Sequence, residues 1–176
     1  MDKETFDTLF EEQVARRLAR SGFTSKGKTL HLSDSHITVA LIRLGGRMSV
    51  PGSISHILCF RHSFLRDRSE QVPKAAPTEV FDYPYKFKPL EGVQGELAYR
   101  PQNLSYDYER LVWDKVDESS VRQKLDRMAD VVEDRFLPWA KALLPTTAKS
   151  EIEQRGEDAW CERMWIADYA ANLPSE

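Results

Sequence analysis

The four histidines of this chain are the residues best suited to bind a metal ion or to move a proton near neutral pH. They are His31, His36, His56 and His62. His56 and His62 fall in one predicted strand with the same parity, but extended chain separates them by roughly 20 Å, so they cannot share an ion. His36 could meet His56 across neighbouring strands, although a histidine in paired strands is usually structural. No histidine pair has helical spacing and no Cys-x-x-Cys is present, so we expect neither a metal nor another cofactor.

Nucleophilic catalysis has one weak candidate, His62-Ser63 followed by Asp67. These are the residue types of a catalytic triad, but adjacency in the sequence is not triad geometry. No Gly-x-Ser-x-Gly elbow surrounds Ser63, and no glycine-rich loop opens a helix for phosphates. A group of acids also lies where a strand meets a helix: Asp114, Asp117 and Glu118. Helix capping and the helix dipole already explain acids at such a place. We therefore do not predict an enzyme.

A predicted long helix carries a crowded acidic face opposite its apolar stripe. The acids are Asp126, Asp130, Glu133 and Asp134. Two like-charged pairs have i, i+4 spacing, and each costs about 0.2–0.5 kcal/mol in an isolated helix. Only Arg122 and Arg127 offer nearby relief. Such a face is usually just solvated. It would also suit a partner with a basic surface.

Four aromatic side chains recur with period two, which predicts an extended segment with all four rings on one face. They are Phe81, Tyr83, Tyr85 and Phe87, with Lys86 and Lys88 between and after them. In composition this resembles a stacking platform for single-stranded nucleic acid, to which Arg61, Arg66 and Arg68 could add charge. The interpretation that we favour is an aromatic face packed on the core, with lysines outward to protect an edge strand.

These residues need elements to position them, and the first is a helix. Apolar residues spaced by three and four from Phe6 to Leu18 indicate an amphipathic helix that packs on the core. Gly22 supplies the C-cap and Phe23 folds back onto the apolar side. We attribute Arg16, Arg17 and Arg20, near the end of this helix, to the helix dipole.

Three strands follow, at Lys28–Ser33, His36–Leu44 and Ile54–Phe64, and the first two form a hairpin around Asp34-Ser35. A polar surface loop is predicted from Leu65 to Val80. Pro84 limits the aromatic segment to an edge. Further strands are expected at Glu96–Arg100 and Tyr106–Val116.

The rest of the chain has helical patterns. Ser119 or Ser120 is the predicted cap of the long helix, which Pro138 should kink or break. A short helix from Pro145 to Gly156 and a last one from Asp158 to Ala171 are expected, the latter anchored by aromatic residues and Met164. This order of elements predicts an α+β fold: an N-terminal helix packed on an antiparallel sheet of about five strands, followed by C-terminal helices.

Length and composition suit one soluble globular domain. We expect residues 1–176 to form it, with helix and sheet in 1–118 and the helical part in 119–176. The charged fraction is 30%, the net charge −3 and the pI about 5.9, which argues against a duplex-DNA binder. No apolar run has membrane-spanning length and no signal peptide is recognised, so a cytoplasmic protein is expected. Cys59 and Cys161 are predicted to be buried, reduced thiols.

The helix ending at Gly22-Phe23, the basic turn, the strands, Trp113 near a strand end and the long helix together resemble a bacterial family known as domain of unknown function four-three-zero-four. The similarity spans Phe6 to Leu144. Members often carry an amide residue in the second strand, and Thr38 to Leu44 here contains none. The resemblance implies no activity and no catalytic residues.

Two hypotheses follow from the sequence. The first is a bacterial, non-enzymatic protein-binding module, of immunity type, whose acidic helix face binds a basic protein such as a toxin. The second is a single-stranded nucleic-acid-binding protein that uses Tyr83, Tyr85, Lys86 and Lys88. We expect neither a membrane nor, under the first hypothesis, a nucleic acid as partner.

Overall fold

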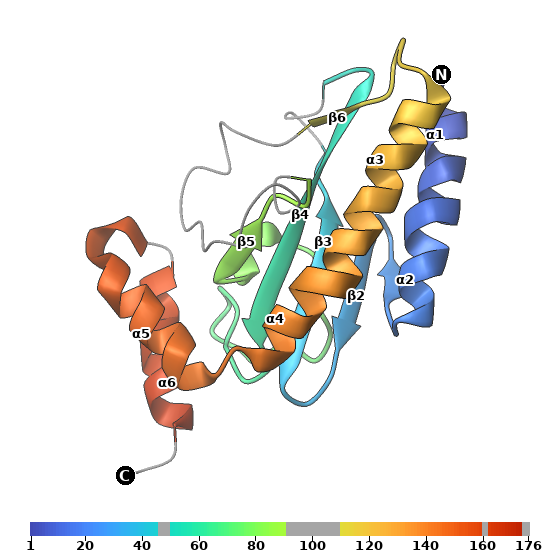
Figure 1. Ribbon diagram of the computed structural model, residues 1–176. Helices are drawn as coiled ribbons and strands as arrows, with labels where there is room; N and C mark the ends of the chain where they lie inside the picture. Colours follow the sequence, from blue (N-terminus) through green and yellow to red (C-terminus); the bar gives the residue numbers. More distant parts are fainter. Residues whose placement is uncertain (46–49, 91–109, 160–161, 174–176) are drawn as a thin grey trace.

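A computed structural model describes residues 1–45, 50–90, 110–159 and 162–173 (Figure 1). Its centre is an antiparallel sheet with the strand order β1-β2-β3-β4-β5, and β6 pairs with the beginning of β4. The strands are β1 Thr24–Lys26, β2 Thr29–Ser33, β3 Ile37–Arg43, β4 Ser53–His62, β5 Tyr85–Phe87 and β6 Arg110–Val112. With helices before and after the sheet, the predicted α+β fold is confirmed.

The N-terminal helix consists of α1 (Lys3–Phe10), a π-helical turn η1 (Glu11–Ala15) and α2 (Arg16–Arg20). Asp2 caps it by accepting the Thr5 N–H at 2.8 Å. At the other end Gly22 has φ +94°, and the Phe23 N–H donates to the Leu18 carbonyl at 3.1 Å. These bonds form a Schellman C-cap. The predicted end of the helix is therefore confirmed, whereas the π turn and strand β1 were not predicted.

The long helix runs through α3 (Glu118–Asp130), a second π turn η5 (Val131–Phe136) and α4 (Leu137–Ala142). Its N-cap is Asp117, whose carboxylate accepts the Ser120 N–H at 3.1 Å, so the predicted serine cap was wrong. Pro138 does not end the helix. It follows directly on the wider π turn, where the missing N–H and the displaced carbonyl are accommodated.

The two long helices lie side by side on one face of the sheet and form the helical layer (Figure 1). Their apolar stripes meet the sheet in one continuous core. Buried members are Phe6, Val14 and Leu18 from the first helix, Val121, Leu125 and Phe136 from the second, and Leu41, Leu58 and Phe60 from the sheet. The N-terminal helix is thus the core-packing element that its periodicity predicts.

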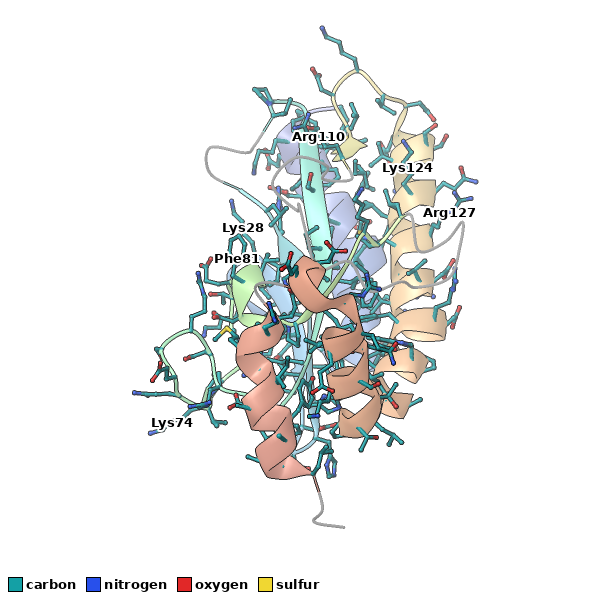
Figure 2. All side chains as sticks on the ribbon, turned by 90° about the vertical axis from the view of Figure 1, so that its left-hand side faces the viewer. Lys28, Lys74, Phe81, Arg110, Lys124 and Arg127 are labelled. Carbon is teal, nitrogen blue, oxygen red and sulfur yellow. The ribbon has the colours of Figure 1, made fainter. Side chains whose placement is uncertain are left out.

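The opposite face of the sheet is covered by the segment between β4 and β5, on the side away from α3 in Figure 2. A small apolar cluster forms there, consisting of Ala40, Ile42, Ile57, Cys59, Val80 and Tyr83. Arg61 is buried beneath this segment and donates hydrogen bonds to the carbonyls of Asp82, at 2.8 Å, and Leu65. The expected surface loop therefore also closes the second face of the sheet.

The C-terminal helical unit, residues 145–159 and 162–173, packs beside β5 (Figure 1). It contains α5 (Pro145–Arg155), the 3₁₀ turns η6 (Gly156–Ala159) and η7 (Glu162–Trp165), and α6 (Ile166–Asn172). The helix predicted from Pro145 to Gly156 is confirmed, but the predicted last helix is divided. Trp165 and Tyr169 are buried as anchors, whereas Met164 is exposed. The strand expected at 96–100 lies outside the described residues.

Candidate functional site

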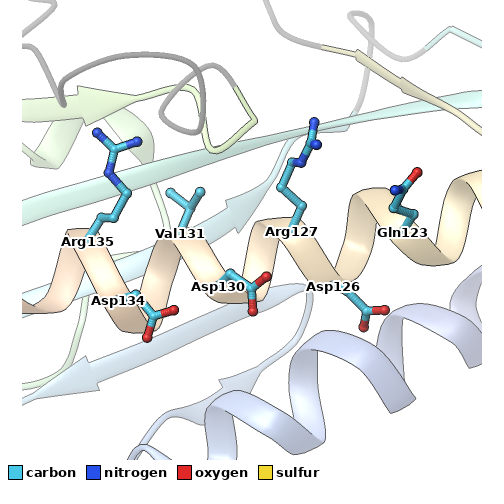
Figure 3. Close-up of a pocket in the computed structure, with 7 residues that line it drawn as sticks. All are labelled: Gln123, Asp126, Arg127, Asp130, Val131, Asp134 and Arg135. Atoms are coloured by element: carbon cyan, nitrogen blue, oxygen red, sulfur yellow. The ribbon is translucent and has the colours of Figure 1, made fainter.

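The predicted acidic face lies on α3 and η5, and the structure divides it into two parts. Asp126, Asp130 and Asp134, here called the acidic row, lie along the side of the helix that faces the N-terminal helix (Figure 3). Glu133 belongs to the neighbouring row and is only 21% exposed. The two parts differ in whether their carboxylates already have partners within the chain.

Arg17 of the N-terminal helix occupies the middle of the acidic face. Its guanidinium lies 2.6 Å from Glu133 Oε2 and 2.6 Å from Asp130 Oδ1. Ser21 donates to the other oxygen of Glu133 at 2.5 Å. Although partial burial opposes the shift, hydrogen bonds to both carboxylates raise the pKa of Arg17. The helix dipole alone therefore does not explain Arg17, because this side chain joins the two helices.

Asp126 is also partly engaged within the chain. The Gln13 carboxamide donates to its carboxylate and accepts from Arg122, in the orientation that satisfies both groups. Arg122 further contacts Glu118 at 3.2 Å. The like-charge crowding seen in the sequence is thus relieved by groups of the first helix, which sequence spacing cannot reveal.

Asp134 is the exposed member of the row for which no internal partner exists among the described residues. Beside the row lies a shallow surface hollow of about 380 Å³. Its lining residues are Gln123, Asp126, Arg127, Asp130, Val131, Asp134 and Arg135. In Figure 3 the three acids lie along one edge, while Arg127 and Arg135 project from the other. The outer surface of this helix therefore has one acidic and one cationic edge.

The aromatic segment does not form one exposed face. Tyr85 and Phe87 point into the main core, where Tyr85 makes an edge contact with Phe60 at 5.7 Å. Tyr83 is buried in the cluster on the opposite face of the sheet. Phe81 is 53% exposed and lies under the Arg68 guanidinium at 5.4 Å. The period-two prediction was wrong, because Phe81 lies within the 3₁₀ turn Val80–Asp82 and a bend at Pro84 separates Tyr83 from Tyr85.

The cations expected around these rings are buried or paired. Lys86 and Lys88 are 2% and 6% exposed, and Lys86 Nζ lies 2.8 Å from Glu162 Oε1. Arg66 pairs with Asp168 at 2.6 Å. A stacking platform needs accessible ring faces and accessible cations. In this fold Tyr83, Tyr85, Lys86 and Lys88 provide neither, and the prediction of outward lysines was wrong.

The histidines and the possible nucleophile do not converge. His62 Nδ1 accepts from the Tyr169 hydroxyl at 3.0 Å, and its Nε2–H donates to the Leu143 carbonyl at 3.1 Å. Ser63 instead donates to the Asp34 carbonyl at 2.9 Å. Asp67 accepts hydrogen bonds within its own turn. Among the described residues, no group of three or more potential metal ligands is present.

His56, considered from the sequence only as a candidate metal ligand, is the most unusual histidine of the fold. It is 1% exposed, stacks on Phe10 at 4.9 Å, and neither ring nitrogen has a hydrogen-bond partner. Burial, assisted by the nearby charge of Arg43, lowers the pKa of His56 to about 3. Its strand partner is Arg43, at the end of β3 far from His36, so the two histidines do not meet.

Comparisons with protein-family models, with curated proteins and with solved structures gave no match for this chain. The resemblance described above therefore remains a prediction. Every helix within the described part of the chain is too short or too polar to span a membrane.

Proposed function

We propose that this chain is a cytoplasmic, non-enzymatic protein-binding module whose acidic row contacts a partner with a basic surface. The observation that carries this proposal is the exposed carboxylate of Asp134, which has no internal partner in the described structure. The next acid of the row, Asp130, is half-exposed. A lysine- or arginine-rich surface would relieve the crowding of these charges. The specific form of the proposal is an immunity-type protein that binds a basic toxin.

The position of Arg17 limits which acidic residues can be used to test partner binding. Asp130 and Glu133 already hold this guanidinium, so replacing them would disturb the helical layer as well as a partner. Asp134 is free of that ambiguity among the described contacts. A sharp test therefore reverses the charge of Asp134 and leaves Asp130 and Glu133 unchanged.

The test compares Asp134→Lys with Glu157→Lys, an equal charge change on an exposed residue of the C-terminal helical unit. Tagged protein captures partners from bacterial cytosol, and each captured protein is then titrated in purified form. We expect a basic partner whose affinity falls several-fold in Asp134→Lys, mostly through a slower association rate, with a smaller effect at high salt. Equal capture by both variants would refute the proposed surface.

A further inference from the structure

The C-terminal helical unit is joined to the rest of the chain by a segment that has the form of a hinge. Leu143 and Leu144 are extended, with ψ 115° and 148°, between the end of α4 and Pro145 at the start of α5. Pro145 begins the new helix without needing the N–H that it lacks. The unit can therefore change its orientation here without breaking either helix.

Polar residue pairs attach the unit to the sheet side of the molecule. They include His62–Tyr169, Arg66–Asp168, Arg66–Trp165, Tyr85–Glu151 and Lys86–Glu162. Tyr85 and Lys86 are consecutive in β5 and point to opposite faces of the sheet, so the unit contacts this strand from both faces. In three of these pairs the unit contributes a carboxylate, and in a fourth the Trp165 indole N–H donates to the Arg66 carbonyl at 2.6 Å. In the His62–Tyr169 pair, the acceptor is an imidazole nitrogen of the sheet.

We propose that His62 is a pH-sensitive latch that releases the C-terminal helical unit from the sheet under mildly acidic conditions. His62 lies beside the hinge, and its two nitrogens contact the hinge itself, at the Leu143 carbonyl, and the unit beyond it, at the Tyr169 hydroxyl. Protonation of Nδ1 removes the acceptor for the tyrosine proton. It also leaves a cation among Phe60 and Phe64, a cost that undocking relieves.

The direction of the pH dependence follows from burial. Desolvation lowers the pKa of His62 in the docked state, opposed only by the Leu143 carbonyl. In the undocked state the imidazole regains its ordinary pKa near 6.5. Docking is therefore strongest above that value and weakens as the pH falls through it. Between pH 7.5 and 5.0 the undocking constant should rise by up to about thirty-fold.

Other charged or titratable groups also lie around this node. They are Asp168 and the phenol of Tyr169 on α6, Glu151 on α5, Lys141 on α4, Asp34 at the β2–β3 turn and Arg61 on β4. Burial raises the pKa of the Tyr169 phenol, away from this pH range. Although partial burial opposes it, hydrogen bonds from the backbone N–H groups of Ile37 and His36 lower the pKa of Asp34. His36, also at the β2–β3 turn, is exposed and serves as a control.

The test is hydrogen exchange on the full chain from pH 7.5 to 5.0, with labelling times scaled to the intrinsic exchange rate. Peptides from 145–159 and 162–173 should lose protection at low pH relative to those from 118–142. His62→Gln, which cannot titrate, should abolish this difference, and His36→Gln should preserve it. Equal loss in both regions, or an unchanged pH response in His62→Gln, would overturn the latch.

If His62→Gln leaves the unit undocked at every pH, imidazole NMR of the unaltered protein shows whether protonation of His62 and undocking occur together. His62 should remain neutral, with hydrogen on Nε2, until amide signals of α6 shift, and the two should then titrate together. An imidazole that titrates while α6 remains docked would equally overturn the proposal.

Discussion

The helical layer and the C-terminal helical unit are attached to the same sheet by different kinds of contact. In the layer, apolar stripes form the core, and the ion pairs lie at the rim, where Arg17 is 27% and Asp130 55% exposed. In the unit, the Lys86–Glu162 pair is almost completely buried, at 3% and 0% exposed. The polar contacts of the helical layer thus lie at the edge of an apolar interface, whereas the Lys86–Glu162 pair of the C-terminal helical unit lies in the protein interior.

The difference in burial determines what each polar contact contributes. A half-exposed pair gains little, because water and salt already solvate and screen its charges. A buried pair gives little net stability when compared with apolar residues, yet losing one partner is costly. We therefore expect substitutions of single charged residues to damage the unit far more than the layer.

The largest expected effect is that of Glu162→Ala. It leaves the Lys86 ammonium buried without its partner, which should lower the free energy of unfolding by about 3–5 kcal/mol. Urea denaturation measures this loss. The double variant Lys86→Met/Glu162→Leu removes both charges and should recover most of the stability. A loss below about 1 kcal/mol for Glu162→Ala would contradict the contrast between the two attachments.

The next effect is that of an apolar truncation in the layer. Leu125→Ala removes a fully buried side chain of α3 and should cost about 2–5 kcal/mol, because the core cannot collapse completely into the space. Val112→Ala, at a side chain that is 44% exposed, should change stability by less than about 0.5 kcal/mol. Similar losses in both variants would show that the layer does not depend on its apolar stripe.

Features that depend only on neighbouring residues can be predicted from the sequence. Gly22 and Phe23 indicate the helix end because the C-cap needs only neighbouring residues, and the β2–β3 hairpin follows from alternation around a short turn. The common side of Asp126, Asp130 and Asp134 likewise follows from the helical period. The end of the first helix and the hairpin were predicted correctly, and the binding role of the acids stays a prediction.

The partners of those residues are not readable, because they come from distant parts of the chain. Glu133 meets Arg17 across 116 residues, and Tyr169 meets His62 across 107. One bend at Pro84, between Tyr83 and Tyr85, was enough to place these two rings on opposite faces of the sheet. Lys86 is buried against Glu162, a residue far along the chain that the alternation within β5 cannot indicate.

His56 tests whether the layer gains anything from a buried polar group. Its two nitrogens have no partner, so His56→Leu should raise the free energy of unfolding by about 1 kcal/mol at pH 7. The pKa of His56 is about 3 in the folded state and near 6.5 in the unfolded state. The free energy of unfolding of the unaltered protein therefore falls by about 1.4 kcal/mol for each pH unit between pH 6.5 and pH 3. The stability gained by His56→Leu should therefore be larger at pH 5 than at pH 7. Urea denaturation of both proteins at the two pH values measures the gain and its pH dependence. A variant less stable than the unaltered protein would refute the prediction.

The smallest expected effect is that of Arg17→Met, which keeps the aliphatic stem but removes the guanidinium between Asp130 and Glu133. Because these groups are partly exposed, the loss should be about 0.5–1 kcal/mol and should shrink in high salt. Urea denaturation at two salt concentrations measures it. A loss as large as that of Glu162→Ala would mean that rim charges also determine this attachment. The variant also frees Asp130 and Glu133, so under the proposed function it should bind a basic partner more tightly even though it is slightly less stable.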